Sequence, residues 1–344
     1  MELNKEILNK LGAIPDHLMV GVGRFLRKKN QSSYSVYLKS LEFYQKYLDG
    51  DPSDFFLLPE KAPKVTSKNT TDFMTGKMHK FLFDSSYHVK NPMLAGDLSA
   101  FTKNRRVPLH LFTHEGLGKR PLVLCLHGFM LGDLDISMKM FSIQNLFKKG
   151  VDVALYTLPY HGSRTDHFYN QSLLCPHKLP LSLEGVAQAI EDLHSSILLL
   201  NQFGYEKPAV IGASLGAFTG CLYSTRSNLM DSLFLVVPAV NLHPMLAPEN
   251  SLFNFELTDQ MATMSKSLID FITPENYESQ LSPDSMKIVY HKGDKLLDSM
   301  NLASFAQKWK IENLVEVTGG HWLYFDQKIR GKTWYSWLNH RGFI

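Results

Sequence analysis

Short apolar runs recur along the chain from about residue 120 onward. Most are rich in Val, Ile and Leu and are separated by segments long enough for helices; they lie at residues 122–126, 153–158, 209–211, 233–237, 286–290 and 314–317. Strands buried on both faces read as continuous apolar runs, and strands that alternate with helices form parallel sheets. The pattern therefore predicts an α/β fold with a parallel sheet covered on both faces.

Two further strands and one clear helix complete this part of the chain. Residues 78–84 and 107–113 contain no long apolar run and suit strands at an exposed sheet edge. The helix shows apolar residues in steps of four and three, with polar residues on the opposite face: Val186, Ile190, Leu193, Ile197 and Leu200 against Glu191, Asp192 and Ser195.

The first 77 residues are predicted to be a helical extension, followed by the α/β unit at residues 78–344. Apolar residues recur there at helical spacing in three sets: Leu3, Ile7 and Leu11; Leu18, Val22, Phe25 and Leu26; Tyr37, Leu41, Tyr44 and Leu48. The stretch 61–77 is polar and rich in turn residues, which indicates a connector.

Residues 239–285 interrupt the alternation of strands and helices. They carry methionine and phenylalanine side chains among polar ones: Met245, Met261, Met264, Phe253 and Phe255. Such side chains form adaptable apolar walls, so we expect a mobile cap over a site. The alternative is a helical excursion that only covers the sheet.

Composition narrows the class of protein without naming a substrate. The 344 residues are 44% hydrophobic and 20% charged, with a formal net charge of +3. This is ordinary for a globular protein and gives no electrostatic case for binding nucleic acid.

Cys125, Cys175 and Cys221 form no disulfide framework, and we expect buried thiols in a reducing compartment. No secretory signal or membrane span is recognisable, so we expect a cytoplasmic protein.

Candidate chemistry centres on the sequence PAVIGASLGAFTG at residues 208–220, where a strand runs through Gly212-Ala213-Ser214-Leu215-Gly216 into a helix of small residues. A serine on a sharp strand-to-helix turn needs glycines two residues before and after it, because side chains there would collide. The turn presents the hydroxyl at the carboxyl edge of the sheet. The pattern predicts Ser214 as a nucleophile.

A serine nucleophile needs a base, and the base needs an acid that orients it. Asp294 follows the strand at 286–290, and His321 follows two glycines after the strand at 314–317. Among fourteen histidines, His321 alone follows the last strand and precedes a single closing helix. We expect His321 to be the base and Asp294 the acid, with Asp298 on the same loop as the reserve acid.

Negative charge on a tetrahedral intermediate needs two N–H donors already in place. One is expected from the backbone N–H of Leu215, directly after the nucleophile. The other is expected from the N–H of Phe129, in the sequence LHGF at residues 126–129 that closes an earlier strand. His127 is then expected to hold this loop by hydrogen bonds rather than to exchange protons.

The turn PYHGSR at residues 159–164 lies at the same predicted sheet edge. Tyr160 and His161 are therefore candidates to border the substrate pocket, as is Trp322 beside His321. The alternative for the turn is a glycine bend that only holds the loop. Arg164 could bind a carboxylate or phosphate of the substrate, although pairing with a nearby acid such as Asp166 is favoured.

The motifs HGF, YHGSR, GASLG, HKGD and GGHW, in that order, resemble the α/β-hydrolase superfamily, in its lipase/esterase and dienelactone-hydrolase-like branch. The resemblance covers about residues 78–344. It implies an eight-stranded, mostly parallel sheet and a triad of Ser214, Asp294 and His321. It implies hydrolysis of a carboxylic ester or thioester, from a small or lipid-like substrate, with no metal or organic cofactor.

Three alternatives remain at this point. The same triad serves acyltransferases and amide or peptide hydrolases, and a non-catalytic binding protein could use the same scaffold.

The N-terminal helix ending at Arg24-Phe25-Leu26-Arg27-Lys28-Lys29 combines an apolar stripe with a cationic end, which suits peripheral contact with an anionic membrane. The favoured alternative is a helix packed on the domain, with basic residues at its carboxyl end.

Overall fold

The computed structural model describes residues 2–25, 33–165, 174, 178–247, 253–297, 299–325 and 327–344. Its centre is a nine-stranded sheet in the order β1-β2-β3-β5-β4-β6-β7-β8-β9. The strands are β1 (Val65–Phe73), β2 (Gly76–Asp84), β3 (Arg106–Thr113), β4 (Leu122–Leu126), β5 (Asp152–Tyr156), β6 (Ala209–Ala213), β7 (Ser232–Val236), β8 (Met286–His291) and β9 (Leu314–Val317). Pairing is antiparallel from β1 to β5 and parallel from β5 across to β9.

The predicted α/β class is confirmed, and β2 to β9 are the eight strands expected from the sequence. The ninth, β1, lies within the stretch 61–77, so the predicted connector is wrong for residues 65–73. This strand forms the edge of the sheet and exposes almost every side chain, so it carries no apolar pattern. A tight turn with Met74 at φ 51° joins it to β2.

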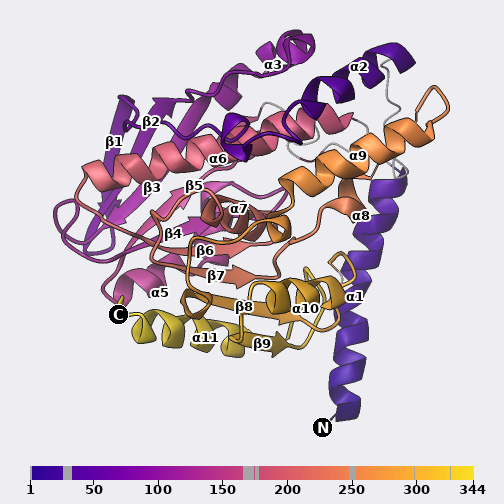
Figure 1. Ribbon diagram of the computed structural model, residues 1–344. Coiled ribbons are helices and arrows are strands. Elements are labelled where there is room, and N and C mark those ends of the chain that lie inside the picture. The colour runs from indigo at the N-terminus through magenta and orange to yellow at the C-terminus, as the bar shows by residue number, and fades with distance from the viewer. Residues whose placement is uncertain are drawn as a thin grey trace.

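Helices cover both faces of the sheet (Figure 1). They are α1 (Glu2–Phe25), α2 (Tyr34–Gln45), α3 (Ala95–Ser99), α4 (Leu134–Met140), α5 (Ile143–Lys148), α6 (Leu179–Gln202), α7 (Leu215–Ser224), α8 (His243–Leu246), α9 (Asp259–Ile272), α10 (Ser299–Lys308) and α11 (Gln327–His340). One apolar core joins α2, α6, α7 and α9 to one face, and a second joins α5 and α11 to the other.

The N-terminal helices account for the three apolar sets. The first two sets belong to α1, which continues through Pro15, apart from Leu26, which lies outside the described residues. The third set lies in and just after α2, whose Tyr37 and Leu41 are buried in the core. Figure 1 shows α1 passing beside the carboxyl ends of β8 and β9, where the candidate site lies.

The insertion at 239–285 connects β7 to β8 and contains α8 and α9. Its aromatic residues pack on the N-terminal extension: the ring centroids of Phe253 and Phe255 lie 5.0 Å and 5.9 Å from that of Tyr37 in α2. The insertion and the extension therefore share one apolar contact. A role as a mobile cap stays a prediction.

The helix predicted from residues 186–200 is the middle of α6, and it is buried on nearly all sides. Its polar face, which includes Glu191 and Asp192, does not reach solvent. The hydroxyls of Ser86 and Ser85 donate to these two carboxylates at 2.7 Å and 2.5 Å. The polar stripe is thus an internal contact with the loop that follows β2.

The two cysteines that the structure describes, Cys125 and Cys221, are free and buried, as the sequence predicts. Burial raises the pKa of both thiols well above the ordinary value. Cys175 lies outside the described residues. Among the helices that the structure describes, none is long and apolar enough to cross a membrane.

Candidate active site

Ser214 stands alone between the end of β6 and the start of α7. Its backbone has φ 51° and ψ −112°, a strained conformation for a residue with a side chain. Hydrogen bonds hold it there: its N–H donates to the Val236 carbonyl at 2.8 Å, and its carbonyl accepts the Phe218 N–H at 3.0 Å. The strand, the turn and the helix therefore fix the serine at the carboxyl edge of the sheet, as predicted.

The glycines on either side of the serine have no room for side chains. A methyl group on Gly216 would lie 2.1 Å from the carbonyl oxygen of Leu126, at the end of the neighbouring β4. A methyl group on Gly212 would lie 2.6 Å from Cα of Ala217. The glycine spacing seen in the sequence thus reflects close packing of the turn on the strand beside it.

The structure brings Ser214, His321 and Asp294 into one chain of hydrogen bonds. The Nε2 atom of His321 lies 3.1 Å from Oγ of Ser214, and its Nδ1 atom lies 2.7 Å from Oδ2 of Asp294. With the ring proton on Nδ1, the imidazole donates to the carboxylate and accepts from the hydroxyl. Asp298, the reserve acid, lies outside the described residues.

The Asp294 carboxylate is itself fixed by the loop after β8. Its Oδ1 atom accepts the backbone N–H groups of Leu296 and Leu297, each at 2.9 Å. Its side chain is 5% exposed and that of His321 is 7% exposed, so water screens their interaction little. This arrangement holds one tautomer and one orientation of the imidazole.

The two residues expected to supply N–H groups to an oxyanion, Leu215 and Phe129, belong to segments that pack against the serine. Leu215 is the first residue of α7, where helix geometry provides no acceptor for the N–H group. Phe129 follows Gly128, and a methyl group on Gly128 would lie 3.4 Å from Cβ of Ser214. The loop after β4 and the first turn of α7 thus flank the hydroxyl.

His127 holds the loop of Phe129 by two hydrogen bonds. Its Nδ1 lies 2.8 Å from the Gly128 carbonyl oxygen, and its Nε2 accepts the Leu158 N–H at 3.0 Å. Burial lowers the pKa of His127 to about 3, so the ring is neutral. These contacts agree with the loop-holding role predicted from the sequence.

Tyr160 and His161, two of the candidate pocket residues, are almost completely buried. The Tyr160 N–H donates to Oδ1 of Asn104 at 2.9 Å. The ring of His161 lies 5.7 Å from that of Phe129, and its Nδ1 lies 2.8 Å from the Pro159 carbonyl oxygen. Their burial favours the alternative in which this turn supports the site, and contact with substrate stays a prediction.

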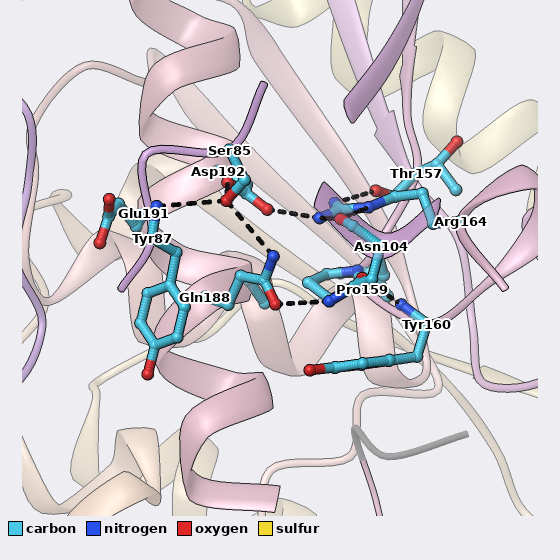
Figure 2. A network of polar contacts seen from close by, with 12 residues as sticks. Ser85, Tyr87, Asn104, Thr157, Pro159, Tyr160, Arg164, Gln188, Glu191 and Asp192 are labelled. Carbon is cyan, nitrogen blue, oxygen red and sulfur yellow. Dashed lines mark hydrogen bonds and ion pairs between the residues drawn. The ribbon is translucent and has the colours of Figure 1, made fainter. Parts of the chain in front are cut away.

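Arg164 is buried inside the protein and pairs with an acid, as favoured from the sequence. Its fully buried guanidinium lies 2.6 Å from Asp192 on α6, and it donates to the carbonyls of Asn104 and Thr157. Figure 2 shows how Gln188 extends this network toward Ser85. The predicted local partner, Asp166, lies outside the described residues; the observed partner is more distant in sequence because α6 packs its polar face on this turn.

Trp322, the third candidate pocket residue, lies beside the imidazole. Its ring centroid is 5.6 Å from that of His321 in an edge-on arrangement, and its side chain is exposed. Contact between Trp322 and a substrate stays a prediction.

One contributor to the site was missed in the sequence. Asn9 and Asp16 on α1 accept backbone N–H groups of the loop that carries His321. The signal is present in the sequence as small and polar residues at helical spacing, Asn9, Gly12, Ala13 and Asp16. The apolar residues on the other face of that helix dominate its pattern and mask this signal.

The described residues hold no cluster of three or more His, Cys, Asp or Glu side chains suited to bind a metal ion. The groups that the structure gathers around Ser214 are a hydroxyl, an imidazole and a carboxylate.

Solved structures of esterases share the fold at low sequence identity. An acetyl xylan esterase from Paenibacillus sp. R4 is 10% identical, with a TM-score of 0.58 over 92% of this chain and 98% of the other. A cold-adapted esterase from an Arctic intertidal metagenomic library is 16% identical, with a TM-score of 0.52 over 80% and 99%. Est1E from Butyrivibrio proteoclasticus, bound to ferulic acid, is 14% identical, with a TM-score of 0.50 over 80% and 98%.

No curated protein matches the chain in sequence. Residues 121–271 match the model of the alpha/beta hydrolase fold family, from the start of β4 to the end of α9 and including Ser214. The match, the strand order and the solved structures agree. This chain is a protein of the α/β-hydrolase fold.

Proposed function

We propose that the protein is a serine hydrolase that cleaves small carboxylic esters or thioesters through an acyl-enzyme. The observation that carries this proposal is the continuous chain of hydrogen bonds from Ser214 through His321 to Asp294. The esterases among the similar structures support the choice of an ester carbonyl as the reacting group.

In the first half of the reaction, Nε2 of His321 takes the proton of the Ser214 hydroxyl as Oγ attacks the carbonyl carbon. Asp294 stabilises the resulting imidazolium and keeps it oriented. The N–H groups of Leu215 and Phe129 receive the negative charge that develops on the carbonyl oxygen. The imidazolium then returns the proton to the departing alkoxide or thiolate.

In the second half, His321 takes a proton from water as the water oxygen attacks the acyl group on Ser214. Collapse of the second tetrahedral intermediate releases the carboxylic acid and returns the proton to Oγ. Only the substrate and one water molecule are consumed, so each turnover restores the starting enzyme.

The test is covalent labelling of the purified full chain with a fluorophosphonate, followed by peptide mass spectrometry. We expect the label on Ser214, and we expect Ser214→Ala to lose labelling and at least about 10⁴-fold of the turnover of p-nitrophenyl acetate. Ser99→Ala, which changes an exposed serine at the end of α3, serves as the matched control. Undiminished ester turnover by Ser214→Ala would overturn the proposal.

A further inference from the structure

The N-terminal helix packs its small residues directly on the loops of the proposed base and acid. A methyl group on Gly12 would lie 2.3 Å from the backbone nitrogen of Gly320, and one on Gly320 would lie 2.1 Å from the Gly12 carbonyl oxygen. A methyl group on Gly293, in the acid loop, would lie 2.6 Å from the Asn9 carbonyl oxygen. The helix and both loops therefore meet backbone to backbone.

Asp16 lies at the centre of this contact and is 0% exposed. Its Oδ2 atom accepts the His321 N–H at 2.8 Å and the Lys295 N–H at 3.1 Å. Its Oδ1 atom accepts the Trp322 N–H at 3.3 Å. One carboxylate oxygen thus joins the backbone of the base to the residue that follows Asp294.

The loop before His321 cannot fix its own conformation through side chains, because it consists of Gly319 and Gly320. Gly319 has φ 135°, a conformation that favours glycine. Its N–H donates to Oδ1 of Asn9 at 2.8 Å. Side chains of α1 therefore bind the backbone of this loop at two points, the N–H groups of Gly319 and His321.

The cost of burying Asp16 indicates that the contact does more than attach a helix. Among the residues that the structure describes, Asp16 forms no salt bridge, and its carboxylate accepts three backbone N–H groups. A buried carboxylate is expensive unless hydrogen bonds satisfy it, and apolar side chains would attach a helix with less penalty. What the carboxylate adds is a fixed direction for three N–H groups.

We propose that Asp16 is a positioning residue of the active site. It holds the imidazole of His321 and the loop of Asp294 in the correct position relative to each other. The inference rests on the proposed serine hydrolase function. Asp16 acts through the backbone and does not touch the reacting atoms. Because misplacement of a reacting group by about 1 Å can lower a rate about 100-fold, loss of this anchor reduces kcat rather than substrate binding.

Two substitutions at this position separate positioning from attachment. Asp16→Ala removes all three acceptors, whereas Asp16→Asn retains one oxygen that can accept both N–H groups now bound to Oδ2. We expect Asp16→Ala to lower kcat and the fluorophosphonate labelling rate of Ser214 about 100-fold, with KM within about twofold. We expect Asp16→Asn to recover about tenfold of that loss, which leaves its kcat about tenfold below that of wild type. His17→Ala, an exposed neighbour on the same helix, is the control.

Each outcome bears on one proposal. If wild-type protein is not labelled, the hydrolase function fails. If wild-type protein is labelled, and folded Asp16→Ala matches it in kcat and labelling rate, the positioning role is overturned. If Asp16→Ala does not fold, as judged by its circular dichroism, Asp16→Asn decides: wild-type kcat overturns the role, and a lower kcat at unchanged KM supports it.

Discussion

Asp294 uses its two oxygens for different partners: Oδ2 lies 2.7 Å from Nδ1 of His321, and Oδ1 accepts the N–H of Leu296 at 2.9 Å. The backbone of the loop thus fixes the carboxylate through Oδ1, and Oδ2 remains available to bind the imidazole. In Asp294→Asn, the amide carries no charge to stabilise an imidazolium and can present a donor where an acceptor is needed.

We therefore expect Asp294→Asn to lower kcat by about 10³- to 10⁴-fold with little change in KM or thermal midpoint. Steady-state kinetics with p-nitrophenyl acetate measures the change. Wild-type kcat in this variant would mean that another acid orients His321, and Asp298 would be the first to test.

A second prediction concerns the glycines of the serine turn. Gly216→Ala places a methyl group 2.1 Å from the Leu126 carbonyl oxygen, so β4 and α7 must separate. We expect loss of activity and a loss of at least about 2 kcal/mol in the free energy of unfolding, comparable to overpacking of a core.

The matched control is Gly331→Ala within α11, where no heavy atom lies within 4 Å of the added methyl group. Alanine favours a helix over glycine by about 1 kcal/mol, so this variant should be as stable as wild type or more so. Urea unfolding of both variants gives the comparison. Equal stability of the two would contradict the close packing of the turn.

The buried pair of Arg164 and Asp192 gives a third prediction. Their side chains are both 0% exposed and lie 2.6 Å apart. Asp192→Asn leaves the guanidinium buried without a counterion, and removal of one partner of a buried pair costs about 3–5 kcal/mol. We expect a loss of that size in the free energy of unfolding.

Asp72→Asn is the control for that loss, because it breaks the ion pair with Lys77 on the exposed edge hairpin. An exposed pair contributes at most about 1 kcal/mol. If Asp192→Asn cost no more than Asp72→Asn, the turn at 159–164 would not depend on α6 for its position.

Acid sensitivity is the fourth prediction. Burial lowers the pKa of His127 to about 3 and that of His161 to about 4, against 6.5 for an ordinary histidine. Below pH 6.5 the unfolded chain takes up protons that the folded chain excludes. Stability from these two groups is therefore complete above about pH 6.5 and is lost as the pH falls toward 4, by up to about 1.4 kcal/mol per pH unit for each.

Urea unfolding across this range measures the slope. His161→Gln should reduce the slope below pH 6.5, because only His127 of the pair would still contribute. Identical slopes for His161→Gln and wild type would show that His161 is protonated in the folded protein.

The sequence revealed the parts of the site whose chemistry is local. Ser214 is recognisable because its turn demands glycines at fixed positions, and His321 because it follows the last apolar strand. The sheet places both residues at its carboxyl edge. The pattern of buried strands already predicts such a sheet.

Contacts between distant segments were not predictable in the same way. β1 exposes nearly all of its side chains and lacks the apolar pattern that marks a strand. The sequence pattern places Asp192 only on the polar face of a helix, whereas the structure shows that it binds Arg164 inside the protein. Asp16 belongs to the small and polar face of α1, but its partners are backbone N–H groups of a loop about 300 residues away, and such partners leave no pattern in the sequence.

The last prediction concerns the surface of α1 that faces away from the site. Four apolar side chains form a stripe there at helical spacing and are 45–65% exposed: Ile7, Leu11, Ile14 and Leu18. The helix is packed on the domain, as favoured from the sequence, but by its small and polar face. The apolar stripe is left uncovered within the described residues. Membrane contact, the less favoured alternative from the sequence, is therefore still to be tested.

Vesicle flotation tests this contact. We expect the full chain to float with vesicles that contain anionic lipid, and the double substitution of Leu11 and Leu18 by Asp to lower the bound fraction at least about tenfold. Leu57→Asp, at another exposed leucine, is the control. Equal recovery of all three proteins would dismiss membrane binding. Point substitutions are preferable to removal of residues 1–30, because that deletion also removes Asp16 and would confound loss of membrane contact with loss of the anchor for His321.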